Sequence, residues 1–268
     1  MYEETVSKWG KNMKLKHDEV SQLVTRGSIT NLELVLVDRS DFQSISMVAD
    51  AIVLEQFEWI RKHVPEFNEL KEFDLYTYEH SYKVARISTM FALYQGYGKN
   101  FVEGIALAGL LHDIGKLYIP EPILKKKHNF TDTDRLLVST HPTLGYTMLQ
   151  QHELNISKDV LNAILYHHER YDGKGYTFGL MGRDIPLMPT ILHIVDIYSA
   201  MTEKRVYKRA ISSETTIKAM LKDKGSCHPI YLQSFIDFYN EILEEHTPQL
   251  PKKKISIRGL THFFHKAS

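Results

Sequence analysis

Histidine and aspartate side chains, which are common metal ligands in proteins, recur along this chain in a pattern that helices could gather into one pocket. A single histidine on a helix is more often a surface or core residue, and a single aspartate more often ends a helix or forms a surface ion pair. The joint pattern is more specific, because most of the candidates lie on or at the end of amphipathic segments. The candidate ligands are His80, His112, Asp113, His141, His167, His168 and Asp196.

The adjacent pair His112 and Asp113 favours a site with two metal ions. Neighbouring residues on a helix point about 100° apart, so the two side chains can face two neighbouring centres. A carboxylate has two oxygens and can bridge two ions, whereas an imidazole completes a single coordination sphere. We therefore predict that Asp113 is the bridge. One sphere would be completed by His80, His112 and Asp196, and the other by His141, His167 and His168.

This ligand set indicates two divalent transition-metal ions, with iron or manganese favoured. Five imidazoles and two carboxylates suit such ions better than magnesium, which prefers oxygen ligands and water. The single cysteine, Cys227, excludes both a thiolate metal cage and an intrachain disulfide. Such sparse cysteine usage is typical of a reducing compartment, so we expect a cytoplasmic protein.

The segments that must position these side chains have helical periodicity nearly throughout, and we predict an all-α fold. Apolar residues recur at helical spacing, and the candidate ligands lie on or beside the apolar stripes. Gly96 and Gly115 are expected to end two of the helices. A short strand is possible over 33–37. The predicted helices cover 41–64, 76–94, 101–114, 158–169 and 189–202.

Charge and hydropathy limit the classes of partner. Lysine plus arginine and aspartate plus glutamate number 33 each, so the overall charge does not call for a nucleic acid polymer or an anionic membrane. The longest apolar runs fall short of the roughly 20 residues that span a bilayer, and the first residues lack a signal-peptide core. We therefore expect neither membrane insertion nor secretion.

The 268 residues divide into three predicted parts. A small, mostly helical N-terminal extension covers 1–70, the main domain covers 71–246, and a basic C-terminal segment covers 247–268. The amphipathic stretch 47–64 could pack on the main domain or pair two chains, so a homodimer is a further expectation.

Several sequence blocks resemble the HD-GYP branch of the HD phosphohydrolase superfamily. Residues 112–116 read HDIGK and residues 166–176 read YHHERYDGKGY. The order and spacing of all the blocks from about 74 to 238 make the resemblance specific, whereas HD alone would be a weak signal. Further matching blocks are HSYKVA from His80, HPTLGYTML from His141, GLMGRDIPLMPTIL, and IVDIYSAMTEKRVYKRA around Asp196.

The resemblance implies that 71–246 is an HD-GYP catalytic domain, a helical bundle around a binuclear metal centre. In this family a metal-bound hydroxide opens a phosphodiester of cyclic di-GMP, which gives linear pGpG, and further cleavage to GMP is left open. All seven candidate ligands match family positions. Trinuclear members carry a glutamate one turn before the first histidine, where this chain has Tyr76, so a binuclear site is expected.

Further residues are predicted to act on the substrate. The resemblance places Lys116 beside the scissile phosphate, and with Asp113 it forms the predicted catalytic pair. Arg205 and Lys208 match phosphate-contacting residues, although ordinary solvated charge is the alternative.

The glycine-rich loop supplies the remaining predicted substrate contacts. Gly173 and Gly175 would allow a tight turn close to the substrate, with a plain helix-ending loop as the alternative. Asp172 could orient a ligand or the leaving oxygen. Tyr176 could stack on a guanine, although a core tyrosine is the more common case.

Three positions depart from the family pattern. Thr177 stands where the GYP signature has proline, which puts in doubt a signalling protein partner at that loop. Ser199 replaces an aspartate, which affects the surroundings of the metals. The Phe-Asp-Pro motif near the last helices is reduced to Cys-His-Pro at 227–229. Two alternatives to the phosphodiesterase therefore remain, namely an HD hydrolase of another nucleotide and a non-catalytic effector that binds cyclic di-GMP.

Overall fold

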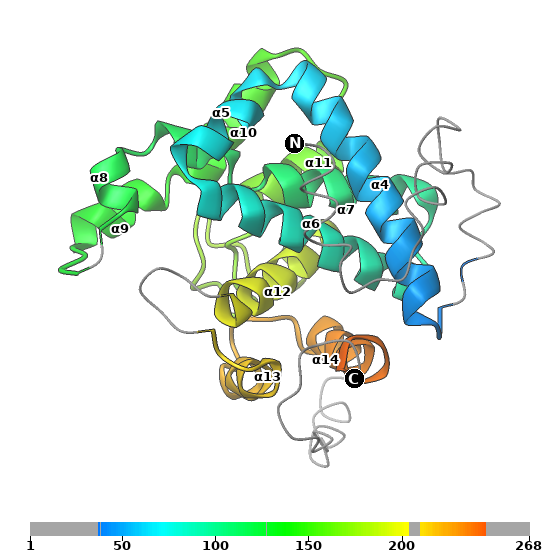
Figure 1. Cartoon of the computed structure of the whole chain (residues 1–268). Coiled ribbons are helices and arrows are strands. Elements are labelled where there is room, and N and C mark those ends of the chain that lie inside the picture. The colour runs from blue at the N-terminus through cyan, green and yellow to red at the C-terminus, as the bar shows by residue number, and fades with distance from the viewer. Residues whose placement is uncertain (1–36, 38, 127, 204–209, 245–268) are drawn as a thin grey trace.

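A computed structural model describes Val37 and residues 39–126, 128–203 and 210–244. Every regular element in these ranges is a helix, which confirms the predicted all-α fold (Figure 1). The longer helices are α4 (Phe42–His63), α5 (Pro65–Phe73), α6 (Leu75–Gln95), α7 (Lys99–Leu111), α10 (His141–Gln151), α11 (Lys158–Tyr166), α12 (Leu187–Thr202), α13 (Ser213–Lys222) and α14 (Pro229–Phe238). The shorter elements are η1 (Ile114–Tyr118), α8 (Glu121–Leu124), α9 (Asp132–Val138), η2 (Gly182–Asp184) and the π-helical turn η3 (Tyr239–Leu243).

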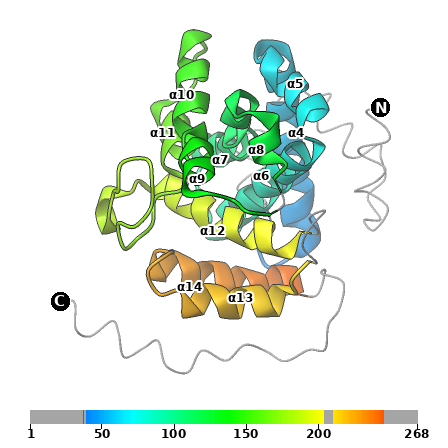
Figure 2. The same ribbon diagram turned by 90° about the vertical axis from the view of Figure 1, so that its left-hand side faces the viewer.

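Helices α6 and α7 form the centre of the bundle. Their apolar faces are almost completely buried, and α4, α11 and α12 all pack against this pair. Helix α12 lies between the central pair and α13, whereas α14 contacts both α12 and α6. Helices α10 and α11 lie side by side (Figure 2). Helices α8 and α9 project away from this core (Figure 1). The ends of the central helices are therefore close to the ends of several others, and this is the arrangement that a shared site requires.

Helix α4 corresponds to the helix predicted over 41–64. It begins at Asp41, whose Oδ2 accepts a hydrogen bond of 2.7 Å from the amide of Ser44, a normal N-cap. Its apolar face is buried against α6 and α7, and Arg86 of α6 donates to Asp50 at 2.6 Å. Of the two roles predicted for this helix, packing on the main domain is the one seen in the single chain.

The predicted helix end is right at Gly96 and wrong at Gly115. Gly96 has a φ of 76° and caps α6 in the left-handed conformation. Helix α7 already ends at Leu111, and the chain tightens into η1, which contains Gly115. A Cβ atom at Gly115 would collide with the carbonyl oxygen of His141. Glycine is therefore needed there so that η1 can approach α10, and not as a helix stop.

Some predictions fall outside the described residues. The strand predicted over 33–37 lies there except for Val37, and so does the basic segment 247–268. Among the described helices, none combines the length and the apolar character needed to cross a membrane.

Candidate metal centre

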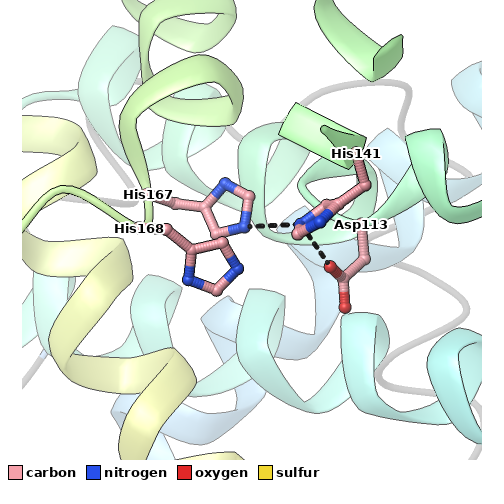
Figure 3. Close-up of side chains that lie close together, drawn as sticks. All are labelled: Asp113, His141, His167 and His168. Carbon is pink, nitrogen blue, oxygen red and sulfur yellow. Dashed lines mark hydrogen bonds and ion pairs between the residues drawn. The ribbon is translucent and has the colours of Figure 1, made fainter. Parts of the chain in front are cut away.

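The predicted ligands come from five separate parts of the chain and meet at the ends of the central helices. Within the described residues, two groups have donor atoms that all lie within 4.8 Å of one another, and Asp113 belongs to both. Figure 3 shows the group formed by Asp113, His141, His167 and His168. The second group is His80, His112 and Asp113, and Asp196 of α12 joins it through a 2.9 Å contact with His80. The structure thus brings all seven candidate ligands together.

Three of the histidines are held by nearby backbone carbonyls. In His112, His141 and His167, the Nδ1 atom contacts the carbonyl oxygen three residues earlier. A carbonyl can only accept, so Nδ1 carries the proton and the Nε2 lone pair faces the centre. This is the tautomer that binds a metal ion through Nε2. The acceptors are the carbonyls of Gly109, Val138 and Ile164, at 2.9, 2.7 and 2.7 Å respectively.

The Nε2 atoms of these rings fit a bound cation. Those of His141 and His167 lie 3.2 Å apart (Figure 3), and Nε2 of His112 is buried without a hydrogen-bond partner among the described residues. Asp113 oxygens lie 3.3 Å from Nε2 of His112 and 3.1 Å from Nε2 of His141. Because lone pairs of buried acceptors face one another, a shared cation would compensate them. Imidazole and carboxylate donors are also the ligands that transition metals prefer.

Asp113 is positioned and charged as a bridging ligand requires. The residue is only 2% exposed, and its Oδ2 accepts a 2.5 Å hydrogen bond from Nζ of Lys116 on η1. Burial by itself raises the pKa of the Asp113 carboxyl, but the positive charge of Lys116 and the contacts with His112 outweigh it and hold the pKa well below its usual range. Asp113 is therefore an ionised carboxylate with oxygens directed to both groups.

Two histidines of the group in Figure 3, His167 and His168, are poised as neutral ligands. Burial is the main cause that holds the pKa of His167 well below its usual range, and the neighbouring imidazoles of His168 and His112 add to it. Burial likewise dominates for His168, with His141 next. A neutral imidazole has a free lone pair, so these rings need not lose a proton to bind an ion near neutral pH.

The other side of the centre is built from charged side chains. Nε2 of His80 lies 2.9 Å from Oδ1 of Asp196, and Nδ1 of the same ring lies 2.9 Å from Oε2 of Glu203. Burial lowers the pKa of His80, but the bonds to Asp196 and Glu203 outweigh it and raise the pKa to about 9. Glu203 was missed from the sequence. Its spacing of seven residues from Asp196, two helical turns, is the signal that could have found it, although α12 ends one residue before it.

The glycine-rich loop borders this cluster. The ring of Tyr176 packs on His168, with centroids 4.7 Å apart, and is partly buried. Gly175 lies so close to the backbone of His168 that a Cβ atom would collide with it. Gly173 has a φ of 73°, the left-handed conformation that favours glycine. The predicted tight turn is therefore present, and it sets Tyr176 against a candidate ligand.

Asp172 is engaged away from the candidate ligands. Its carboxylate accepts hydrogen bonds of 3.1 and 3.0 Å from Nε and Nη2 of Arg170, and its Oδ1 accepts one from the amide of Lys174 at 3.1 Å. These contacts shape the loop, and the role of Asp172 in orienting a ligand or the leaving oxygen stays a prediction. Arg205 and Lys208, the predicted phosphate contacts, lie outside the described residues.

A second carboxylate missed from the sequence organises the segment after Tyr176. Glu169, which is 2% exposed, accepts hydrogen bonds from four consecutive backbone amides. The amide of Thr177 is one of them, at 3.1 Å, and the Thr177 hydroxyl donates to the carbonyl of Leu165 at 3.0 Å. Proline, which the family signature has at this position, could not donate the amide bond. The departure at Thr177 therefore adds contacts to the loop.

Comparisons with known proteins identify relatives of the chain. A family model described as HD domain matches residues 59–228. A cyclic di-GMP phosphodiesterase from Pseudomonas aeruginosa is 38% identical over 167 residues, which are 62% of this chain and 40% of that protein. A 3'3'-cGAMP-specific phosphodiesterase from Vibrio cholerae is 34% identical over 161 residues, 60% of this chain and 36% of that protein. The chain thus spans less than half the length of these two relatives.

A solved structure supports the fold. An HDG"Y"P protein from Bdellovibrio bacteriovorus matches with a TM-score of 0.55 and 18% sequence identity. The match covers 89% of this chain and 78% of that one. At this level of identity the likeness concerns the helical architecture, which agrees with the predicted helical bundle.

Proposed function

The chain belongs to the HD domain family, and from this premise we propose that it is a metal-dependent phosphodiesterase that hydrolyses cyclic di-GMP to linear pGpG. Two findings support this proposal: the sequence motifs resemble those of the HD-GYP branch, and the relative from Pseudomonas aeruginosa is a cyclic di-GMP phosphodiesterase. One observation carries the proposal: two groups of donor atoms share a single buried carboxylate, that of Asp113. This is the arrangement that a two-ion phosphodiesterase needs.

We propose that two divalent ions, iron or manganese, bind at the two groups. His80, His112 and Asp196 would hold one ion and His141, His167 and His168 the other, with Asp113 between them. When bound, two such ions supply a water of lowered pKa and neutralise charge that grows on phosphate oxygens. The ionised state of Asp113 and the neutral state of His167 support this assignment.

Side chains around the ligands would bind and orient the substrate. The Lys116 side chain is 21% exposed while its partner Asp113 is 2% exposed, so the ammonium group lies between the buried carboxylate and solvent. The ammonium group of Lys116 would attract a phosphate oxygen there while it keeps its hydrogen bond to Asp113. Tyr176 would form a wall of the same site, and Arg205 and Lys208 remain our proposed contacts to the second phosphate. Cleavage of pGpG to GMP would use the same groups.

Hydrolysis by the full chain tests the proposal. Purified protein loaded with Mn²⁺ should convert cyclic di-GMP to pGpG, and Asp113→Ala should reduce the rate to background because both ions lose a ligand. Asp159→Asn, which removes an exposed carboxylate from the first turn of α11, is the matched control and should keep the wild-type rate. If the loaded wild type gives no product while a known phosphodiesterase does, the proposal is wrong. Binding of cyclic di-GMP without product over hours would instead indicate a non-catalytic effector.

A second candidate substrate is another cyclic dinucleotide. The relative from Vibrio cholerae, a 3'3'-cGAMP-specific phosphodiesterase, is 34% identical and favours this alternative. The ligands would be the same, and only the residues that contact the bases would differ. Competition between equal amounts of cyclic di-GMP and 3'3'-cGAMP, with both products quantified, separates the two. Preferential loss of 3'3'-cGAMP would replace the substrate proposed here.

The remaining proposals concern partners, location and domain limits. Phe178 and Met181 of the loop after Tyr176 are 64% and 60% exposed, and this apolar surface supports a signalling protein partner there. The only cysteine is buried, which supports a cytoplasmic location. We retain a homodimer as a proposal, with sedimentation of the full chain as its test. We also retain the division into 1–70, 71–246 and 247–268, although α4 shares the core of the main domain.

A further inference from the structure

His80 differs from three other candidate ligands in the group that its Nδ1 atom contacts. Nδ1 of His112, His141 and His167 faces a backbone carbonyl, whereas Nδ1 of His80 faces the Glu203 carboxylate at 2.9 Å. The other nitrogen of His80 faces Asp196. Both contacts of the ring therefore come from the C-terminal half of α12 and the residue that follows it.

We propose that Glu203 is a positioning residue for the metal site of His80, His112 and Asp196. Its carboxylate accepts the Nδ1 proton of His80, so that Nε2 presents its lone pair to the ion. A carboxylate behind a ligating histidine fixes the tautomer and ring orientation and makes the ring a stronger ligand. The inference rests on the metal centre proposed above and deepens it, because it assigns a function to a residue outside the ligand set.

The carboxylate of Glu203 is itself fixed by α6. The Tyr76 hydroxyl donates to Oε2 at 3.0 Å, and Nζ of Lys83 lies 3.5 Å from Oε1. The Tyr76 ring stacks on the His80 ring at a centroid distance of 5.9 Å and an interplanar angle of 12°. The Glu203 side chain is only 16% exposed, and a charge-assisted hydrogen bond is stronger where water is largely excluded. Three residues spaced along one side of α6 thus contact Glu203 or the ring it holds.

The contacts of Glu203 argue against direct ligation of an ion. Oε2 already accepts from Tyr76 and His80, and Oε1 faces the ammonium group of Lys83. A cation at either oxygen would have to displace these donors. Among the described residues, the groups with ligand-like spacing do not include Glu203.

Position 199 offers no alternative acceptor for His80. Ser199 lies one turn before Glu203, and its buried hydroxyl has no hydrogen-bond partner among the described residues. The second contact of the His80 ring is therefore supplied by Glu203. A change at Glu203 should consequently act on this half of the centre alone.

Metal titration of the full chain tests the inference independently of catalysis. Chelator-treated protein is titrated with Mn²⁺ by calorimetry, and bound ions per chain are counted by equilibrium dialysis. Loss of a carboxylate behind a ligating histidine weakens metal binding by about 10- to 100-fold. Glu203→Gln keeps the size and an acceptor oxygen and should lie near the lower figure, while Glu203→Ala should lie near the higher one. In both variants the other site should keep its wild-type affinity.

A similar pair elsewhere provides the control. Oε1 of Glu66 lies 2.9 Å from Nε2 of His152, and the two side chains are 23% and 26% exposed. Glu66→Gln removes the same charge from a histidine contact of the same length, so it should bind both ions as the wild type does. Tyr76→Phe removes one donor to Glu203 and should weaken the His80 site by about threefold, as expected for one hydrogen bond. This variant serves if Glu203→Ala fails to fold.

Two results would overturn the inference. One is wild-type affinity for both ions in Glu203→Gln and Tyr76→Phe. The other is a third ion in the wild type that Glu203→Gln loses, because Glu203 would then be a direct ligand. A wild type that binds two Mn²⁺ ions but hydrolyses no cyclic dinucleotide would contradict the proposed function and leave the role of Glu203 standing. A wild type that binds no Mn²⁺ would contradict both.

Discussion

The two halves of the candidate metal centre are held in place by different forces. On one side the His80 ring is bonded to the side chains of Asp196 and Glu203. Both partners lie more than 110 positions from His80 in the sequence. On the other side His141 and His167 are fixed by backbone carbonyls three residues earlier in the chain, as is His112 of the first side. The first half depends on the packing of α6 against α12. The second half depends on local turns that are then brought together by the fold.

His80 and His167, one from each half, also differ in the direction in which their pKa is shifted. Despite its burial, bonds to two carboxylates raise the pKa of His80 to about 9, whereas burial without such partners lowers that of His167. His80, Asp196 and Glu203 thus form an electrostatic network in which each member stabilises the charge of the next. In the second half, burial favours the neutral form of His167 and His168. Substitutions should therefore act through charge in the first half and through packing in the second.

The largest effect is expected when a ligand of the charged half is removed. Asp196→Asn keeps the shape of the side chain but takes away the charge that would bind an ion and that faces His80. Bound Mn²⁺ should fall from two ions to one per chain, and hydrolysis should fall by about 100-fold or more, since one of two ions that stabilise the transition state is lost. Metal counting and initial rates measure the two effects. Retention of both ions would show that His80 and His112 suffice without Asp196.

A smaller effect is expected from a packing change in the second half. Gly115→Ala would place a Cβ atom against the His141 carbonyl and push η1 away from α10. Overpacking of this kind destabilises a fold by about 1–3 kcal/mol, which chemical denaturation of the metal-free protein can measure. Gly98→Ala is the control, because a Cβ atom there meets no described atom within 4 Å. Equal stability of the two variants would contradict the tight contact between η1 and α10.

The sequence was sufficient for features that depend on local periodicity. Helix α6 lies within one or two residues of its predicted bounds, because its apolar stripe and Gly96 are local signals. The candidate ligands were found because most of them lie on or beside the apolar stripes of predicted helices, and the family resemblance then matched all seven. Helix α7 ends earlier than predicted. Gly115 is needed for the close approach of η1 to α10, a contact with a later part of the chain that local periodicity does not reveal. Glu203 and Glu169 were missed for the same reason, since their partners are set by tertiary packing and by the path of a loop.

Glu169 offers a test of the loop that borders the second half. Glu169→Gln would replace a carboxylate that accepts four amide hydrogen bonds with a neutral group that accepts at one atom only. We expect a loss of stability of about 2 kcal/mol, the scale of hydrogen bonds to a charged group. Because Tyr176 immediately precedes the organised segment, KM for the dinucleotide should rise while Mn²⁺ binding stays unchanged. A change in metal stoichiometry would mean that Glu169 also supports the ligands themselves.

The smallest effect is expected at Thr177, where the family signature has proline. Thr177→Pro removes one of the four amide donors to Glu169 and the hydroxyl bond to Leu165, while the other three amides remain. We expect a loss of about 1 kcal/mol in the free energy of unfolding, measured by urea denaturation, because the fixed φ of proline offsets part of the loss. Thr177→Ser keeps both donors and should stay within about 0.5 kcal/mol of the wild type. A Thr177→Pro variant more stable than the wild type would contradict this expectation. It would mean that the proline ring fixes the loop better than the two bonds of Thr177 do, and that three amide donors are enough to stabilise the Glu169 carboxylate.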